Sequence, residues 1–245
     1  MNWKNVDIVV VGPADIDYPL FRKFLHDVHY SFNKIYYVIS TPVEHNTRLL
    51  RNLKSFIEQD LWFAEILQVP DIDGLDDWRH VSTNLALNKS TAEYVLFIEP
   101  DFLIDPPTLY SIPTHDIIGY YETGATERIW PSFLCVKRSI IDKTSKIFYP
   151  MINYDHFDLF TEECLKCTND VFYLNEHNIE FTHYSGVTQN LTLCGLEEYQ
   201  SVTLGTSDKS FITYLENSLN ANVKIEKNWS NVLQTTIFYY KTKPL

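Results

Sequence analysis

The chain has 245 residues, 45% of them hydrophobic and 15% aromatic, so it can bury a substantial core and does not have the composition of a disordered protein. Its formal net charge of -12 argues against a broad nucleic-acid-binding surface, which needs clustered lysine and arginine, but leaves room for a local basic groove. Only seven glycines are present and neither a GxGxxG nor a P-loop pattern occurs, so no glycine-rich phosphate loop is expected.

Signals for a membrane span and for a cysteine-bound metal are weak in this sequence. No apolar stretch approaches the roughly 20 residues needed to span a bilayer, and no signal-peptide pattern precedes the first strand-like segment. These features predict a soluble, cytoplasmic protein. The four cysteines include a CxxC pair, Cys164 and Cys167, but no second pair stands at zinc spacing. Reduced structural thiols are therefore favoured over a zinc or redox site.

The first hundred residues alternate between apolar strand patterns and amphipathic helix patterns. Strands are predicted at residues 7–13, 35–40, 63–69 and 94–98. Helices are predicted at residues 20–28, 49–57 and 78–85, the last of them capped by Asp76 or Asp77. Strands that alternate with helices in this way predict a mainly parallel sheet covered on both faces.

The rhythm changes after Asp101, where three prolines interrupt the chain. Further elements are predicted as short strands at 117–121 and 133–136, a helix at 155–166, extended segments at 171–174 and 179–184, a helix at 210–219 and a β-rich end at 235–240. No repeat or linker is evident. The sequence therefore predicts one domain over residues 1–245, with a first half at 1–101, a second half at 102–190 and a C-terminal extension at 191–245.

Two carboxylates follow the fourth predicted strand directly. Five apolar residues, 94–98, run into Glu99 and Asp101, and a run this short and apolar predicts a strand buried on both faces. Burying two charges is costly unless something pairs with them, and a divalent cation is one such partner. Ligands of open α/β sheets gather at the carboxyl ends of the strands. The segment is thus a candidate metal site, with a solvated acidic turn as the alternative.

The acidic pair and its surroundings resemble the GT-A glycosyltransferases, in particular the family-2-like inverting enzymes, over residues 6–190. In that family a strand ends in a DxD motif, of which residues 99–101 are a variant with Glu in the first position. Asn84 and the run 92–94 match the family upstream, whereas Thr83 and Ala86 replace its usual Arg and Gly.

Downstream matches occur in the expected order. The spacing of Asp158 and His183 resembles that of the family's acidic residue and its H-x-x-G histidine, and residues 133–139 resemble the acceptor-side strand, which ends in Arg-Ser. The resemblance implies a GT-A fold, with a Rossmann-like nucleotide-sugar half at 1–101, a mixed sheet and an acceptor half at 102–190.

Roles for individual residues follow from the same resemblance. It implies Mn²⁺ or Mg²⁺ held by Asp101, Glu99 and His183, because a cation neutralises the charge that develops on a diphosphate leaving group. A carboxylate on the acceptor side would take the proton of the attacking hydroxyl; Asp158 is the first choice and Asp155, Glu162 and Glu163 are alternatives. Contacts to the nucleotide sugar are expected from Gly12, Pro13, Asp15, Asp71, Asp73, Asn84 and Glu99.

The activity implied is metal-dependent, inverting transfer of a hexosyl or pentosyl group from a nucleotide sugar, most simply a UDP-sugar, to a hydroxyl of a carbohydrate or other acceptor. One alternative is sugar transfer onto modified bases of viral or phage DNA. Another is a non-catalytic nucleotide-sugar or carbohydrate-binding module that keeps the fold. Each candidate residue also has an ordinary structural role available: Asp155 or Asp158 as a helix cap, and His183 as a packed histidine.

Overall fold

The structure is a computed structural model that describes residues 1–12, 19–39, 55, 57–68, 78–100, 102–121, 129, 132–144 and 156–183. At its centre lies a seven-stranded sheet in the order β3-β2-β1-β4-β7-β6-β8. These strands are β1 (Val6–Gly12), β2 (Lys34–Ile39), β3 (Glu65–Gln68), β4 (Tyr94–Ile98), β6 (Ile117–Gly119), β7 (Phe133–Lys137) and β8 (Val171–Tyr173). A separate two-stranded sheet pairs β5 (Phe102–Leu103) with β9 (Thr182–His183).

The sheet combines a parallel half with a mixed half. Strands β3, β2, β1 and β4 run parallel to one another, whereas β7 is antiparallel to both β4 and β6. Strand β8 then pairs in parallel with β6 at the far edge. The mainly parallel sheet predicted from the sequence is confirmed, as is the change to a mixed arrangement after residue 101.

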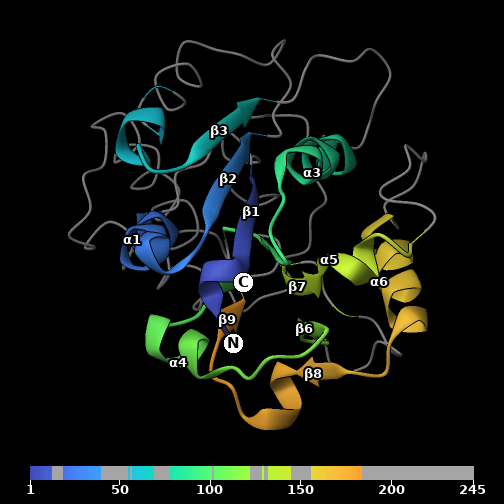
Figure 1. Cartoon of the computed structure of the whole chain (residues 1–245). Helices are drawn as coiled ribbons and strands as arrows, with labels where there is room; N and C mark the ends of the chain where they lie inside the picture. The colour runs from blue at the N-terminus through green and yellow to red at the C-terminus, as the bar shows by residue number, and fades with distance from the viewer. Residues whose placement is uncertain are drawn as a thin grey trace, which may run out of the picture.

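Helices cover both faces of the sheet (Figure 1). They are α1 (Pro19–Val28), α3 (Trp78–Lys89), α4 (Pro106–Ser111), α5 (Arg138–Ile141) and α6 (His156–Cys167), with short 3-10 helices η1 (Trp3–Asn5), η2 (His29–Ser31) and η4 (Leu174–His177). One hydrophobic core lies under α1 and α4, and a second lies under α3, α5 and α6. Strand β4 serves both cores, because Leu96 and Ile98 face the first and Val95 and Phe97 the second.

Two elements differ from the sequence prediction. The sequence predicts that prolines 106 and 107 interrupt the chain, but they begin helix α4. Asp105 caps this helix, and its carboxylate accepts hydrogen bonds from the Thr108 backbone N–H (2.7 Å) and hydroxyl (2.6 Å). Proline fits a first helical turn because the N–H it lacks would have no partner there. Arg138 and Ser139, which the resemblance places at the end of the acceptor-side strand, instead begin the short helix α5.

The other predicted elements of the described regions are present. Strands β1 to β4 lie within the predicted segments or one residue outside them, β3 being the most shortened, and the predicted helix 155–166 corresponds to α6. The predicted helix at 49–57 lies outside the described residues, except for residues 55 and 57, which are helical. The predicted helix at 210–219 and the predicted β-rich end at 235–240 lie entirely outside them.

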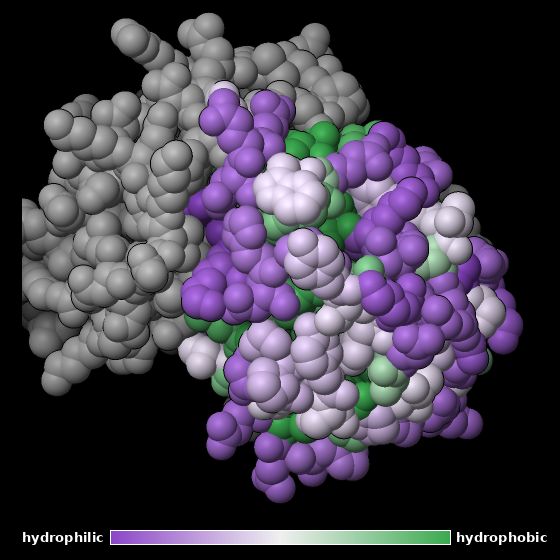
Figure 2. Space-filling model, turned by 60° about the vertical axis from the view of Figure 1, so that its left-hand side comes forward, coloured by the Kyte–Doolittle hydropathy of each residue, from purple (hydrophilic) through white to green (hydrophobic). Residues whose placement is uncertain are grey.

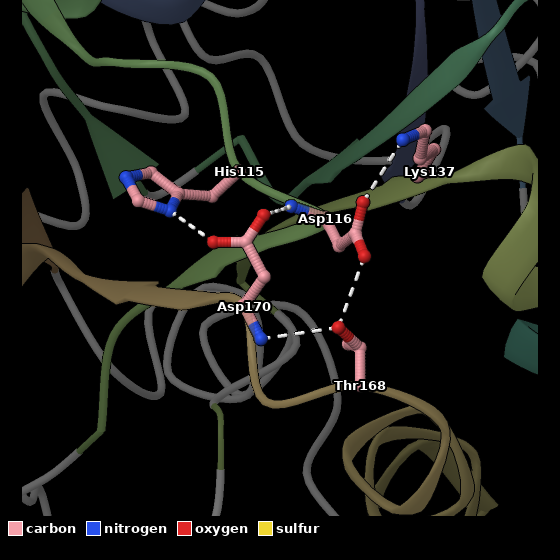
Figure 3. A network of polar contacts seen from close by, with 5 residues as sticks. All are labelled: His115, Asp116, Lys137, Thr168 and Asp170. Carbon is pink, nitrogen blue, oxygen red and sulfur yellow. Dashed lines mark hydrogen bonds and ion pairs between the residues drawn. The ribbon is translucent and has the colours of Figure 1, made fainter.

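A polar network ties β6, β7 and β8 together where β6 and β8 begin and β7 ends (Figure 3). The Lys137 ammonium donates to Asp116 Oδ1 at 3.0 Å, and the Thr168 hydroxyl donates to Asp116 Oδ2 at 2.9 Å. Asp170 lies 2.6 Å from His115 Nδ1 and accepts the Asp116 backbone N–H at 3.1 Å. The His115 hydrogen bond holds the pKa of Asp170 below its ordinary value. This network braces the edge of the sheet opposite the carboxyl end of β4.

Candidate functional site

The carboxyl ends of β1 and β4 define a topological switch point. The chain passes from β1 outward through β2 to β3 and then returns to the other side of β1 to form β4. Connections from these two neighbouring strands leave in opposite directions, which is where open α/β sheets bind ligands. Val10 pairs with Ile98, so Gly12 at the end of β1 and Glu99 just after β4 emerge at the same edge.

The antiparallel half of the sheet brings further residues to this edge. Strand β7 begins opposite the end of β4, with Phe133 paired to Ile98, so Ser132 precedes it at the same level. Strand β6 ends there too, because Gly119 pairs with Leu134, and Tyr120 follows. Phe102 pairs with His183 in the small β5–β9 sheet.

Four side chains at this edge form a continuous chain of polar contacts: Tyr120, His183, Ser132 and Glu99. The Tyr120 hydroxyl lies 2.7 Å from His183 Nδ1, and His183 Nε2 lies 3.0 Å from the Ser132 hydroxyl. That hydroxyl donates in turn to Glu99 Oε2. Ser132 is fully buried and Tyr120 is 3% exposed, whereas Glu99 and His183 are partly buried. The structure thus joins two of the predicted metal-binding residues through one serine.

Backbone contacts fix the position of Glu99. Its N–H donates to the Ser132 carbonyl at 3.0 Å, and its own carbonyl accepts the Phe102 N–H at 3.1 Å. Pro100 follows Glu99, as is common at the second position of a tight turn. Strand β4 is thereby followed by a turn that leads into β5, the strand that pairs with β9, and β9 contains His183.

Burial controls the charge of His183. Removal from water lowers the pKa of its imidazole, against the Glu99 carboxylate, which raises it. The ring is therefore neutral at pH 7, the form in which histidine binds a metal. Carboxylate oxygens suit Mg²⁺ or Mn²⁺, and a neutral imidazole nitrogen can serve as a further ligand. Among the described residues no group of three or more His, Cys, Asp or Glu side chains converges, so this pair forms only part of the predicted ligand set.

Other predicted site residues are placed in part. Asn84 lies on α3 and is partly buried, and the backbone of Asp158 lies in α6. Helix α6 packs on β4 through Phe160, whose ring centroid is 6.0 Å from that of Phe97. Glu162 is exposed, and Glu163 has one buried carboxylate oxygen, Oε2, with no hydrogen-bond partner among the described residues. The remaining candidates lie outside the described residues: Pro13, Asp15, Asp71, Asp73, Asp101 and Asp155.

Cys164 and Cys167 are both free thiols in the described structure. Cys164 is buried and Cys167 partly buried, and neither is in a disulfide. Burial is the main cause of the raised pKa of the Cys164 thiol. A thiol with a raised pKa is a poor nucleophile and a poor metal ligand at neutral pH, in keeping with the structural role predicted for it.

Sequence reasoning missed Ser132 and Tyr120. Their sequence neighbourhoods carry no motif, since Ser132 follows a Trp-Pro pair and Tyr120 belongs to a short apolar strand pattern. The one usable signal was positional: residues flanking strands next to β4 would share its edge. Using it required knowing that β7 is antiparallel to β4, which the sequence pattern does not reveal.

No protein-family model and no curated protein sequence matches this chain. Solved structures do. Residues 1–349 of TarS from S. aureus match with a TM-score of 0.53 at 12% identity, over 95% of this chain and 70% of that one. A mannosyltransferase, PcManGT, from Pyrobaculum calidifontis, in complex with GDP-Man and Mn²⁺, matches with a TM-score of 0.49 at 10% identity, over 96% of this chain and 69% of that one.

A third match is the inositol-1-phosphate CTP transferase of T. maritima, with a TM-score of 0.48 at 12% identity, over 91% of this chain and 99% of that chain. At such identities similarity concerns the fold alone, and the fold assignment rests on the TarS match, which exceeds a TM-score of 0.5. The chain has an α/β fold of the GT-A type, as the sequence predicted. No helix in the described part of the chain is long and apolar enough to cross a membrane; the cytoplasmic location stays a prediction.

Proposed function

We propose that this protein is a metal-dependent, inverting glycosyltransferase that uses a nucleotide sugar, with a UDP-sugar as the first donor to test. The observation that carries the proposal is the placement of Glu99 at the switch point, linked through Ser132 to His183. A carboxylate and a neutral imidazole brought together at the carboxyl edge of a GT-A-type sheet suit a cation-assisted diphosphate site.

Glu99, Asp101 and His183 would hold the cation, Mn²⁺ or Mg²⁺. The donor set fits such an ion, since it offers carboxylate oxygens and an imidazole that burial keeps neutral. A bound cation would supply positive charge beside the diphosphate as the bond to the sugar breaks.

The remaining candidates divide between donor and acceptor. The nucleotide sugar would be oriented by residues on loops that follow the parallel strands and on α3: Gly12, Pro13, Asp15, Asp71, Asp73 and Asn84. The Asp158 carboxylate would accept the proton of the attacking hydroxyl, with Asp155 as the alternative base. Attack from the side opposite the leaving group would invert the anomeric centre.

Nucleotide release from a panel of sugar nucleotides, with and without Mn²⁺, tests the proposal. We expect Mn²⁺-dependent release from one donor, with a hundredfold or greater loss in kcat, on the order expected when charge stabilisation is removed, for Glu99→Gln and Asp101→Ala. Glu65→Gln, at an exposed carboxylate on β3, serves as the control.

The same panel separates the alternatives. Tight binding of a nucleotide sugar with neither transfer nor hydrolysis would assign a binding module instead. Turnover that is independent of metal would remove the cation from the mechanism. For the base, Asp158→Asn should lower kcat with little change in the KM of the donor, while Asp155→Asn should not; the reverse result would exchange their roles.

A further inference from the structure

The hydrogen atoms of the polar chain can be assigned from the chemistry of its members. The Ser132 hydroxyl has a single proton, and it donates that proton to Glu99 Oε2. Ser132 Oγ must then accept, rather than donate, in its 3.0 Å contact with His183 Nε2. That nitrogen therefore carries the imidazole proton.

The other ring nitrogen follows from this assignment. A neutral imidazole has one protonated nitrogen, so Nδ1 of His183 is an acceptor and receives the Tyr120 hydroxyl proton at 2.7 Å. Without a cation, the chain runs from Tyr120 through His183 and Ser132 to Glu99, and every donor points toward Glu99. The ring is the Nε2–H tautomer, and both of its nitrogens are engaged.

The position of Ser132 has a consequence for any cation. His183 Nε2 and Glu99 Oε2 both contact the Ser132 hydroxyl. An ion shared by this carboxylate and this imidazole approaches the same point, and it needs the lone pair of Nε2, the nitrogen to which this assignment gives the proton. Tyr120 lies at the other nitrogen, where its oxygen can accept a hydrogen bond as readily as its proton can be donated.

We propose that cation binding switches His183 from the Nε2–H to the Nδ1–H tautomer, with the Ser132 hydroxyl moving aside and Tyr120 becoming the acceptor for Nδ1–H. The ring remains neutral and the protons balance, since Nε2 gives one proton to water and Nδ1 takes one up from water, while the Tyr120 hydroxyl keeps its own. Ser132 holds the site closed in the absence of metal, and Tyr120 is the positioning residue that orients the imidazole in its presence. The inference deepens the proposed function, because it rests on His183 and Glu99 as ligands of the same ion.

The two hydroxyls are therefore expected to act in opposite directions. Tyr120→Phe removes the acceptor for Nδ1–H, and loss of such a partner to a metal-bound histidine weakens metal binding by about 10-fold to 100-fold. Ser132→Ala removes the group that competes for Nε2 and should tighten Mn²⁺ binding by about threefold to tenfold, the equivalent of one net hydrogen bond.

The Tyr120 substitution is conservative in packing. The ring lies 5.3 Å from that of Phe102 and 4.9 Å from that of Phe181, centroid to centroid, and phenylalanine keeps both contacts. Tyr110→Phe is the matched control, because it removes a tyrosine hydroxyl bonded to Ser31 on the exposed surface.

The test combines two measurements on the full chain. ¹⁵N-histidine NMR spectra report the tautomer of each ring, and the His183 signals among the eight histidines are assigned by their loss in His183→Gln. We expect Nε2–H without metal and Nδ1–H with saturating Mg²⁺. Mn²⁺ affinity, measured by electron paramagnetic resonance, should fall in Tyr120→Phe, rise in Ser132→Ala and stay unchanged in Tyr110→Phe.

Several results would overturn the inference: an Nδ1–H ring before metal is added, an Nε2–H ring that persists through the Mg²⁺ titration, or a weakening of Mn²⁺ binding in both variants. These outcomes are distinct from a failure of the proposed function. A tautomer switch in a protein that transfers no sugar would support the inference and reject the proposed activity. Sugar transfer without the switch would support the activity and reject the inference.

Discussion

Arg22 is a large charged side chain that is almost completely buried. It lies on α1 with 1% of its surface exposed and forms an ion pair with Asp60, which is itself mostly buried. His26, one turn further along α1, has its Nε2 3.6 Å from the same carboxylate. A buried cation is tolerated only while its charge is compensated, so the pairing fixes helical residues 57–60 against α1.

Removing one partner of this pair should cost more than removing both. Asp60→Ala leaves the buried guanidinium without its carboxylate, and we expect a loss of about 3–5 kcal/mol in the free energy of unfolding. The double variant Arg22→Met/Asp60→Leu removes both charges of the pair together and should be clearly less destabilised. Urea denaturation of both variants measures the difference, with Lys23→Gln at the exposed pair to Asp27 as control. Equal losses in the two variants would contradict the argument.

Among the elements, β6, β7 and β8 depend on side chains as well as on their ladders. Each of these strands is short, and the network around Asp116 and Asp170 joins them where β6 and β8 begin (Figure 3). The Asp170 carboxylate takes part in this network through both of its oxygens. Oδ2 accepts the Asp116 backbone N–H, and Oδ1 contacts His115 Nδ1.

The contribution of Asp170 should depend on pH. Its pKa is lowered in the folded protein, chiefly by the hydrogen bond with His115, so its stabilisation is present above the unfolded-state pKa near 4 and is lost as the pH falls through the folded value. Asp170→Asn should cost about 1 kcal/mol at pH 7, a modest figure because the side chain is 52% exposed and solvent screens it.

Thermal melts of wild type and Asp170→Asn between pH 7 and pH 2.5 check this expectation. The two melting temperatures should converge as the solution becomes acidic, while Asp142→Asn, at an exposed carboxyl, should follow wild type throughout. A difference that is constant with pH would show that packing, and not the charge of Asp170, carries the effect.

The sequence predicted the parallel elements well because their signals are local. Each apolar strand or amphipathic helix in residues 1–100 can be recognised from its own periodicity. Glu99 was identified for the same reason, as the first charge after a buried run. Ser132 and Tyr120 were not, since their relation to Glu99 arises from strand pairing across the sheet. Helix α4 was missed because proline is a helix breaker everywhere except the first turn, where it stands here.

At the scale of the whole molecule, the charge and the surface bear on which partners can bind. The net charge of -12 leaves little attraction for duplex DNA, which disfavours transfer onto DNA bases. One face carries pale, weakly polar side chains between hydrophilic ones (Figure 2). The exposed aromatic side chains of the described residues are Tyr30, Trp62 and Tyr110.

Ligand binding should be visible in the stability of the whole chain. A nucleoside diphosphate with Mn²⁺ at about 100 times its Kd adds roughly 2.7 kcal/mol, which corresponds to a rise of about 5–10 °C in Tm for a chain of this size. We expect UDP to give this shift, and Glu99→Gln to reduce it. A shift with GDP in place of UDP would change the donor, and no shift with any nucleoside diphosphate would contradict a nucleotide site.

The pairing of β5 with β9 has a consequence for how the protein is made. His183 contacts Tyr120, which is 63 residues away in the sequence, and Ser132, which is 51 residues away. It is held there by the β5–β9 sheet, in which each strand is only two residues long. Closing such long loops costs entropy before any contact repays it, so we expect these contacts to form late in folding. The parallel strands can pair on a ribosome-bound chain before residue 183 has emerged. A nascent chain would then have its parallel strands paired yet be unable to join Glu99 to His183, and the site would be completed only after β9 has been synthesised.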